Sequence, residues 1–142
     1  MNLVITMSRR FGTGASIIAK ELSERLDIPV YDKAYIEEQL SGHKYESEAE
    51  AIRKLAEKPC IILGRCASDI LKDQSNVINV FVRADKPDRV RRIMQKEGLS
   101  YEDAREKVEK SDEKRSAYYH VHTVRTWGDV NDYHVILDTS VL

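Results

Sequence analysis

The sequence has little cysteine and no long hydrophobic run. Its only cysteines, Cys60 and Cys66, fit no zinc-ligand spacing, and two ligands cannot close a tetrahedral zinc site. We expect both to be reduced, mostly buried thiols in a reducing compartment. The hydrophobic runs fall well short of the roughly 18–20 residues that cross a bilayer, and no signal peptide is visible. The sequence therefore predicts a cytoplasmic protein with no membrane partner.

An excess of charge of one sign is also absent. The chain has 23 Lys and Arg against 24 Asp and Glu, a formal net charge of −1. This balance excludes the long-range basic field that is typical of nucleic-acid-binding proteins. Affinity for phosphate would have to come from local placement of charges and backbone N–H groups. With 42% hydrophobic and 33% charged residues, the 142-residue composition favours a globular protein, and we expect one domain over residues 1–142.

Short apolar runs alternate with helical patterns, which indicates βαβ units and an α/β fold around a parallel sheet. The predicted strands are Asn2–Met7, Pro29–Tyr31, Cys60–Leu63, Val77–Val82 and Tyr133–Leu137. The predicted helices begin near Gly14 and extend to Leu26, then cover Ala34–Leu40, Ser47–Lys58, Ala67–Lys72 and Lys86–Glu97.

The segment after Gly98 is unusually polar. Across Ser100–Tyr119 the charges interleave, and only Ala104 and Val108 offer an apolar stripe before the tyrosines. A helix of this kind is typical of a solvent-spanning arm or a mobile lid, which we place at about residues 100–125. In the preceding helix, Arg89, Arg92 and Lys96 share one face. We expect that face to be solvated.

The turn Ser8–Ser16 (SRRFGTGAS) follows a strand and precedes an amphipathic helix. Gly12 and Gly14 allow successive N–H groups to point inward, and the helix N-terminus favours an anion. The pattern G-x-x-x-x-G-K-[ST] places Arg9 at its first glycine, Ala15 at the lysine and Ser16 at the Ser/Thr. The phosphate-binding lysine is therefore missing. The alternative interpretation is a tightly packed turn that binds nothing.

Other residues could supply the missing charge. Arg9 and Arg10 flank the turn. Arg65 follows Gly64 at the end of a strand, at the sheet edge where ligands bind in open α/β folds, and its fork can hold a phosphate. The alternative for Arg65 is an exposed arginine after a turn.

On the predicted lid, Asp112, Arg115 and Tyr119 fall on one helical face. A cationic lid would exclude water and complete a charge clamp. The alternative, which we favour for any single charge pair on so charged a helix, is an intrahelical Asp112–Arg115 ion pair that contributes about 0.3–0.5 kcal/mol.

These segments together resemble the cytidylate kinase-like family, a branch of the P-loop nucleoside monophosphate kinases. The similar stretches, in family order, are ITMSRRFGTGASIIAKEL, IPVYDKAYI, CIILGRCASDIL, SDEKRSAYY and WGDVNDYHVILDTSVL. The resemblance implies a three-layer P-loop NTPase-type sandwich with a five-stranded parallel sheet in order 2-3-1-4-5 and a helical lid. It also implies ATP and Mg²⁺ as cofactors and transfer of the γ-phosphoryl group to a nucleotide such as CMP or another small acceptor.

Site residues follow from the resemblance position by position. The phosphate loop carries Gly12, Thr13, Gly14 and Ser16, and Ser16 would reach the metal. Arg65 matches the position that helps hold the acceptor's phosphate, and Asp32 lies where the acceptor site begins. Asp112 and Arg115 match the D-x-x-R element of the lid. We therefore expect Arg65, Asp112 and Arg115 to be catalytic, Asp32 and Arg65 to bind the acceptor, and the cofactor to contact Arg9, Arg10, Gly12, Thr13, Gly14, Ala15 and Ser16.

Three features depart from a complete kinase of this type, and the first is Ala15 at the position of the phosphate-binding lysine. Only Ala34–Lys58 is available for the acceptor-binding region between the second and third strands, and no terminal helix follows the last strand. Two further hypotheses therefore stay open. One is a non-catalytic nucleotide-binding or sensing module, and the other is a scaffold that forms a homodimer where the terminal helix is absent.

Overall fold

The computed structural model describes residues 3–141. Its strands are β1 (Val4–Arg9), β2 (Val30–Tyr31), β3 (Cys60–Leu63), β4 (Val77–Arg83) and β5 (Val135–Asp138). Its α-helices are α1 (Ala15–Leu26), α2 (Lys33–Ser41), α3 (Glu48–Leu55), α4 (Ala67–Ile70), α5 (Lys86–Glu97) and α6 (Tyr101–Thr123). Two short 3-10 helices, η1 (Val130–Asp132) and η2 (Thr139–Val141), flank β5.

The five strands form one parallel sheet in the order β2-β3-β1-β4-β5, which confirms the predicted topology. In the central strand β1, Val4 lies opposite Cys60 of β3 and Val77 of β4. The predicted start of this strand, Asn2, lies outside the described residues. Because β1 continues to Arg9, the first residue of the predicted phosphate loop is the last residue of a strand.

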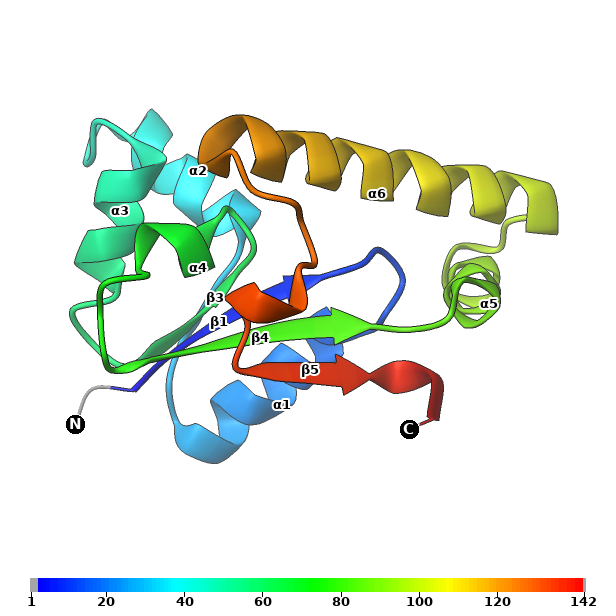
Figure 1. Cartoon of the computed structure of the whole chain (residues 1–142), viewed down its shortest axis with the longest axis horizontal. Coiled ribbons are helices and arrows are strands. Elements are labelled where there is room, and N and C mark those ends of the chain that lie inside the picture. Colours follow the sequence, from blue (N-terminus) through cyan, green and yellow to red (C-terminus); the bar gives the residue numbers. More distant parts are fainter. Residues whose placement is uncertain (1–2, 142) are drawn as a thin grey trace.

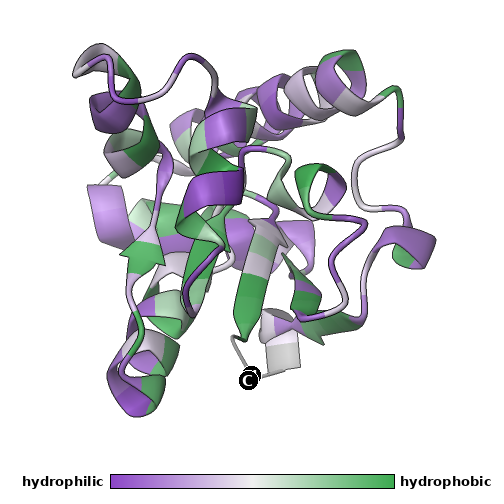
Figure 2. Cartoon of the chain, turned by 90° about the vertical axis from the view of Figure 1, so that its left-hand side faces the viewer, coloured by the Kyte–Doolittle hydropathy of each residue, from purple (hydrophilic) through white to green (hydrophobic). Residues whose placement is uncertain are grey.

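Helices cover both faces of the sheet and make three layers (Figure 1). On one face, Ile36 of α2, Ile52 of α3 and Leu71 after α4 pack against alternate residues of β1 and β3. On the other face, Ala15 and Ala19 of α1 pack against the intervening residues. The strands are accordingly hydrophobic, whereas the outer helices carry mostly hydrophilic residues (Figure 2). This is the pattern of strands buried on both faces.

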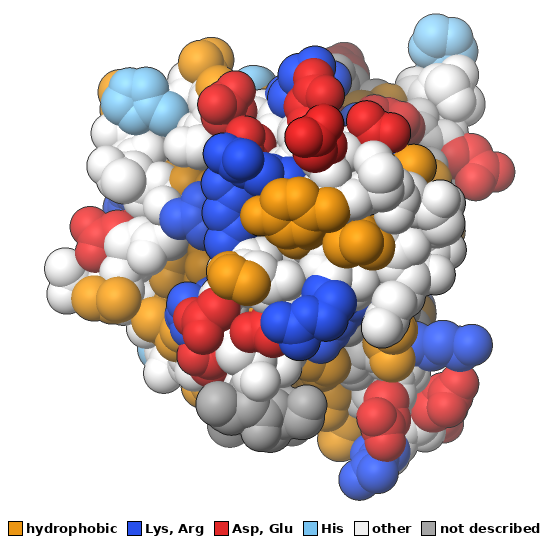
Figure 3. All heavy atoms as spheres, turned by 90° about the vertical axis from the view of Figure 1, so that its right-hand side faces the viewer, with side chains coloured by type: hydrophobic (Ala, Val, Ile, Leu, Met, Phe, Trp, Pro, Cys, Tyr) orange, Lys and Arg blue, Asp and Glu red, His pale blue; other side chains and the backbone are white. Residues whose placement is uncertain are grey.

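Helix α5 lies beyond the carboxyl ends of the strands, and α6 packs against it and then runs back above the sheet toward α2 and α3 (Figure 1). Val90 and Ile93 of α5 and Ala104 and Val108 of α6 form their common core. Helix α6 begins as predicted, with the Ser100 hydroxyl accepting the Asp103 N–H at 3.2 Å. On the side where α5 lies and α6 begins, acidic and basic side chains are interspersed around a small hydrophobic patch (Figure 3). No helix of the described residues is long and apolar enough to cross a bilayer.

The prediction that the face of Arg89, Arg92 and Lys96 on α5 is solvated is wrong for the two arginines, although Lys96 is exposed. Arg89 is only 8% exposed and Arg92 is partly buried. Both side chains point to the loop after β1, where they donate hydrogen bonds to backbone carbonyl groups. Helical spacing alone does not distinguish such a face from a solvated one.

Candidate functional site

The turn between β1 and α1 has the geometry expected of an anion-binding loop. Gly12 and Gly14 adopt positive φ angles of 81° and 79°, and α1 starts directly after Gly14, which caps it without a side-chain hydrogen bond. The helix N-terminus is therefore open to an anion. Ser16 is exposed on the first turn, whereas Ala15, at the lysine position, is buried in the core below α1.

Two side chains of α5 donate hydrogen bonds to backbone carbonyl groups of this loop. Arg89 donates to the Phe11 carbonyl at 3.1 Å, and Arg92 donates to the Thr13 carbonyl. A Cβ at Gly12 would lie 3.0 Å from the backbone oxygen of Arg89, so only glycine permits this approach. The Phe11 and Thr13 carbonyls of the loop are therefore bound by side chains of α5.

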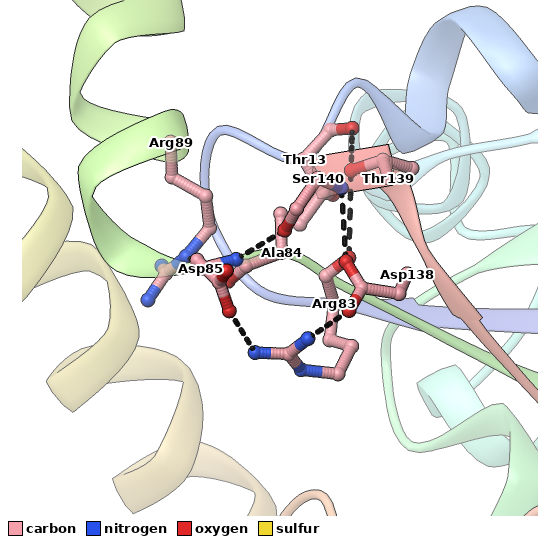
Figure 4. A network of polar contacts seen from close by, with 8 residues as sticks. All are labelled: Thr13, Arg83, Ala84, Asp85, Arg89, Asp138, Thr139 and Ser140. Atoms are coloured by element: carbon pink, nitrogen blue, oxygen red, sulfur yellow. Dashed lines mark hydrogen bonds and ion pairs between the residues drawn. The ribbon is translucent and has the colours of Figure 1, made fainter. Parts of the chain in front are cut away.

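The end of β5 closes the same network (Figure 4). The Thr139 hydroxyl donates to the Thr13 carbonyl at 3.0 Å. Arg83 bridges Asp138 and Asp85, the latter at 3.0 Å, and the Ser140 hydroxyl accepts the Asp85 N–H at 2.6 Å. The loop therefore stands between α5 and the chain that follows β5.

Asp112 of α6 reaches the loop from the opposite side. Its carboxylate accepts the Phe11 N–H at 2.9 Å and an Arg89 N–H at 2.6 Å. The favoured intrahelical Asp112–Arg115 ion pair is wrong, because Arg115 instead donates to the Arg9 carbonyl at 3.1 Å. The Asp112–Phe11 and Arg115–Arg9 hydrogen bonds each join residues more than 100 positions apart in the sequence. They hold α6 against the end of β1 and the loop that follows it.

A cavity of about 320 Å³ lies between α6, the turn after β3 and the end of β1. Its lining reaches the loop at Phe11 but includes none of Gly12–Ser16. The structure thus brings together three of the predicted site residues, Arg9, Arg65 and Arg115. Five basic side chains line the cavity: Arg9, Lys33, Arg65, Lys114 and Arg115.

Arg9 and Arg115 are the partly buried cations of this cavity that have no carboxylate partner, whereas Lys114 is exposed. Among the described residues, no carboxylate lies within ion-pair distance of either guanidinium. Burial and the nearby charge of Arg115 lower the pKa of Arg9 to about 10, although Asp32 partly opposes this. Burial also lowers the pKa of Arg115, and Asp112 partly opposes it. Two partly buried cations that line one cavity favour the binding of an anion there.

Arg65 is neutralised within the protein. It forms an ion pair with Glu48 at the start of α3, and its guanidinium lies 4.5 Å from the ring centre of Tyr118. The Tyr118 hydroxyl donates to the same carboxylate at 2.6 Å. Burial disfavours the charge of Glu48, but these two hydrogen bonds outweigh it and lower its pKa. Arg65 therefore faces the cavity as one half of an ion pair.

Besides Asp112 and the loop residues Gly12–Ser16, the predicted residues Asp32 and Arg10 also lie outside the cavity lining. Asp32 caps α2, where its carboxylate accepts the Tyr35 N–H at 2.9 Å. Arg10 turns toward the segment before β5, with its guanidinium 4.3 Å from the ring centre of Trp127, and burial lowers its pKa. Cys60 and Cys66 are free and buried as expected. No group of three or more potential acidic, histidine or cysteine metal ligands occurs in residues 3–141.

The sequence did not indicate several residues of this site. Lys33, Lys114, Tyr118 and Glu48 carry no motif, and Glu48 meets Arg65 only because α3 folds back over the turn after β3. Lys114 neighbours Arg115 on a helix so charged that no pattern singled it out. Arg89 did belong to a recognisable helical face, but its partners come from two other elements.

Comparison with known proteins places this geometry in context. The sequence model of the Cytidylate kinase-like family matches residues 4–44 and 37–141. A cytidylate kinase from Pyrobaculum islandicum is 25% identical over 162 aligned positions, which cover 99% of this chain and 85% of that protein. Because this chain has only 142 residues, the relative carries residues that this chain lacks. The two family matches meet within and just after α2, in the predicted acceptor-binding region.

Solved structures agree on the fold. An uncharacterized protein from Eubacterium ventriosum is 33% identical, with a TM-score of 0.90 over 96% of this chain and 88% of that one. A shikimate kinase from Bacteroides thetaiotaomicron is 18% identical, with a TM-score of 0.63 over 97% of this chain and 86% of that one. The fold is that of the P-loop kinases.

Proposed function

Because the chain belongs to the cytidylate kinase-like family, we propose that it is a phosphotransferase that uses ATP and Mg²⁺ and phosphorylates a nucleoside monophosphate such as CMP, or another small anionic acceptor. The P-loop kinase fold supports this proposal, as does the cytidylate kinase relative.

The observation that carries the proposal is the pair of uncompensated guanidinium groups. Arg9 and Arg115 line one cavity with no carboxylate partner among the described residues. Holding two such groups together is unfavourable unless the site binds an anion. Electrostatic stabilisation of the transferring phosphoryl group is the main catalytic contribution in phosphoryl transfer, and these are the charges available for it.

The other residues take roles around this pair. Gly12, Thr13 and Gly14 present backbone N–H groups to the ATP phosphates, with Arg10 beside them, and Ala15 leaves the lysine position without a charge. ATP supplies the phosphoryl group, and Mg²⁺, bound by Ser16, would neutralise its phosphates. The exposed Ser16 hydroxyl and the open N-terminus of α1 fit this role.

The acceptor binds on the Arg65 side of the cavity. Arg65 and Lys33 face it there, and Asp32 caps the helix that carries Lys33. The lid helix α6 contributes Arg115 and Asp112, and it excludes water from the reacting groups.

The test is phosphoryl transfer by the wild-type chain and the Arg115→Ala variant, with CMP and the other nucleoside monophosphates as acceptors. We expect ATP·Mg²⁺ to bind with micromolar affinity and kcat to fall about 10²–10³-fold in the variant. Arg105→Ala is the matched control, because Arg105 is an exposed arginine of the same helix that pairs with Glu109. Normal ATP binding without transfer to any nucleoside monophosphate would rule against this function.

A specific observation also favours a second candidate, a non-catalytic nucleotide-binding or sensing module. Ala15 is buried among apolar side chains, so no flexible cation stands at the lysine position. Calorimetry that shows ATP or ADP binding without transfer would support this alternative, and failure to bind any nucleotide would exclude it.

A further inference from the structure

The phosphate loop already holds an anion, which belongs to the protein itself. The Asp112 carboxylate accepts the Phe11 N–H at 2.9 Å with one oxygen and an Arg89 N–H at 2.6 Å with the other. Arg89 also donates to the Phe11 carbonyl at 3.1 Å, so these three residues form a closed ring of charge-assisted hydrogen bonds. We call this ring the Asp112 latch.

The chemistry of the latch matches that of a bound phosphate. A backbone N–H and a guanidinium are donors that a phosphoryl oxygen also takes, and a carboxylate offers similar acceptor oxygens. Arg89 is 8% exposed and its Nε–H is fixed by the Ala84 carbonyl at 3.0 Å. The donors are thus held in place whether or not the carboxylate is present.

The hydrogen bonds of Asp112 with Phe11 and Arg89 also fix the position of α6 relative to the loop. Helix α6 runs above the sheet (Figure 1). Within its bounds, Tyr101–Thr123, Asp112 lies at the middle. Its contacts with Phe11 bring the helix against the loop on the side opposite to Arg92 and Thr139, which hold the Thr13 carbonyl. A phosphate that binds the Phe11 N–H must therefore displace the Asp112 carboxylate.

We propose that the Asp112 latch is an autoinhibitory contact, in which the carboxylate and a phosphate of the nucleotide compete for the Phe11 N–H and the Arg89 guanidinium. The inference rests on the proposed function, because it needs a nucleotide phosphate as the competitor. Phosphate binding releases the middle of α6, and Asp112 returns when the nucleotide leaves. Arg115 then covers the bound phosphates while Asp112 is free.

The first experiment measures the affinity of wild type and Asp112→Asn for ATP·Mg²⁺ and for inorganic phosphate by calorimetry. Asparagine keeps the size of the side chain but removes the competing charge. We expect both ligands to bind about tenfold more tightly to the variant, the effect of losing about one charge-assisted hydrogen bond from the competing state. Glu113→Gln is the matched control, because it removes the same charge from the exposed side of the next position and should change affinity less than twofold.

The outcomes separate the latch from the proposed function. Equal or weaker binding of both ligands by Asp112→Asn overturns the latch, whatever the protein catalyses. If ATP·Mg²⁺ and inorganic phosphate both bind more tightly to the variant but neither protein transfers a phosphoryl group to any nucleoside monophosphate, the latch stands and the proposed function fails.

A second experiment needs no variant and covers the case that Asp112→Asn fails to fold. In amide NMR of the wild-type chain, titration with inorganic phosphate should shift the Phe11 N–H and the α6 amides around Asp112 with one common apparent affinity. Shifts confined to the loop, with the amides around Asp112 unchanged, would contradict displacement of the carboxylate.

Discussion

Arg9 and Arg115 illustrate a compromise between stability and ligand binding. Each guanidinium loses hydration in the cavity, and each lacks a carboxylate partner among the described residues. Burial lowers the pKa of Arg9 to about 10, so the folded state binds its proton less tightly than the unfolded chain does. At neutral pH this arginine therefore disfavours folding, and the penalty is relieved only as the pH rises through about 10.

Replacement of Arg9 should separate the two effects. We expect Arg9→Met to raise the Tm of the ligand-free protein at pH 7 by roughly 2–4 °C, equal to about 1 kcal/mol, because the apolar chain keeps the packing without the charge. The same variant should lose the stabilisation that inorganic phosphate gives the wild type. Differential scanning fluorimetry with and without phosphate measures both quantities.

Arg25→Met is a suitable control, because Arg25 is an exposed arginine that pairs only with Glu21 on the same helix. It should leave the response to phosphate unchanged. A lower Tm for Arg9→Met than for wild type at pH 7 would contradict the uncompensated charge.

Individual site residues could be predicted from the sequence where a local rule places them. Arg65 follows a strand, so the parallel sheet puts it at the edge where the cavity lies. Arg115 belongs to one helical face, and that face does point at the loop. Glu48 and Arg89 act through partners 17 and 23 residues away, and no local rule fixes which elements meet over such separations.

Packing against α5 is a second reason for glycine at position 12 of the loop. The positive φ of Gly12 is needed for the turn, and the missing Cβ is needed because the backbone oxygen of Arg89 would lie 3.0 Å from it and the Ile93 side chain 3.2 Å. A glycine in a phosphate-loop pattern is usually explained by the phosphate alone. Here the contact with α5 would require glycine even in a loop that binds nothing.

Gly12→Ala and Gly98→Ala make a matched pair that measures this packing. Both positions have positive φ, but a Cβ at Gly98 meets no atom within 4 Å. We expect Gly98→Ala to lower the free energy of unfolding by about 1 kcal/mol, the strain of a left-handed alanine. Gly12→Ala should lower it by a further 1–3 kcal/mol or so, because α5 must also move.

Urea unfolding of the two variants and the wild type gives these free energies. An equal loss of unfolding free energy in both variants would show that contact with α5 adds no steric constraint at Gly12. Loss of nucleotide affinity in Gly12→Ala but not in Gly98→Ala would further tie α5 to the conformation of the loop.

Most elements could be predicted from hydrophobic pattern, and the exceptions have a common cause. Cys60–Leu63 and Lys86–Glu97 were predicted with the bounds that the structure has, because a buried run and an amphipathic stripe each end at a clear breaker. The polar pattern also indicated α6. The pattern could not show that its polar face bonds to the loop and to α3, since hydropathy treats a paired charge and a solvated one alike.

At the scale of the molecule, α6 is attached at several separate places. Its first half shares a core with α5, its middle meets the loop at Asp112, and Tyr118 near its end reaches Glu48 of α3. Farther along, Tyr119 packs with Trp127 and Phe81 of β4. Such distributed contacts favour a chain that unfolds as one unit, although α6 itself is mostly exposed.

We therefore expect residues 1–142 to unfold in a single two-state transition. The only tryptophan, Trp127, is 7% exposed and reports on the chain between α6 and β5, whereas far-UV circular dichroism reports on all helices. The two signals should give the same urea midpoint and the same slope. Saturation with ATP·Mg²⁺ at about 100 times its Kd should shift both curves together by about 2.7 kcal/mol. An earlier midpoint for Trp127 fluorescence than for circular dichroism would instead mark α6 and the segment after it as a separate unit that opens on its own.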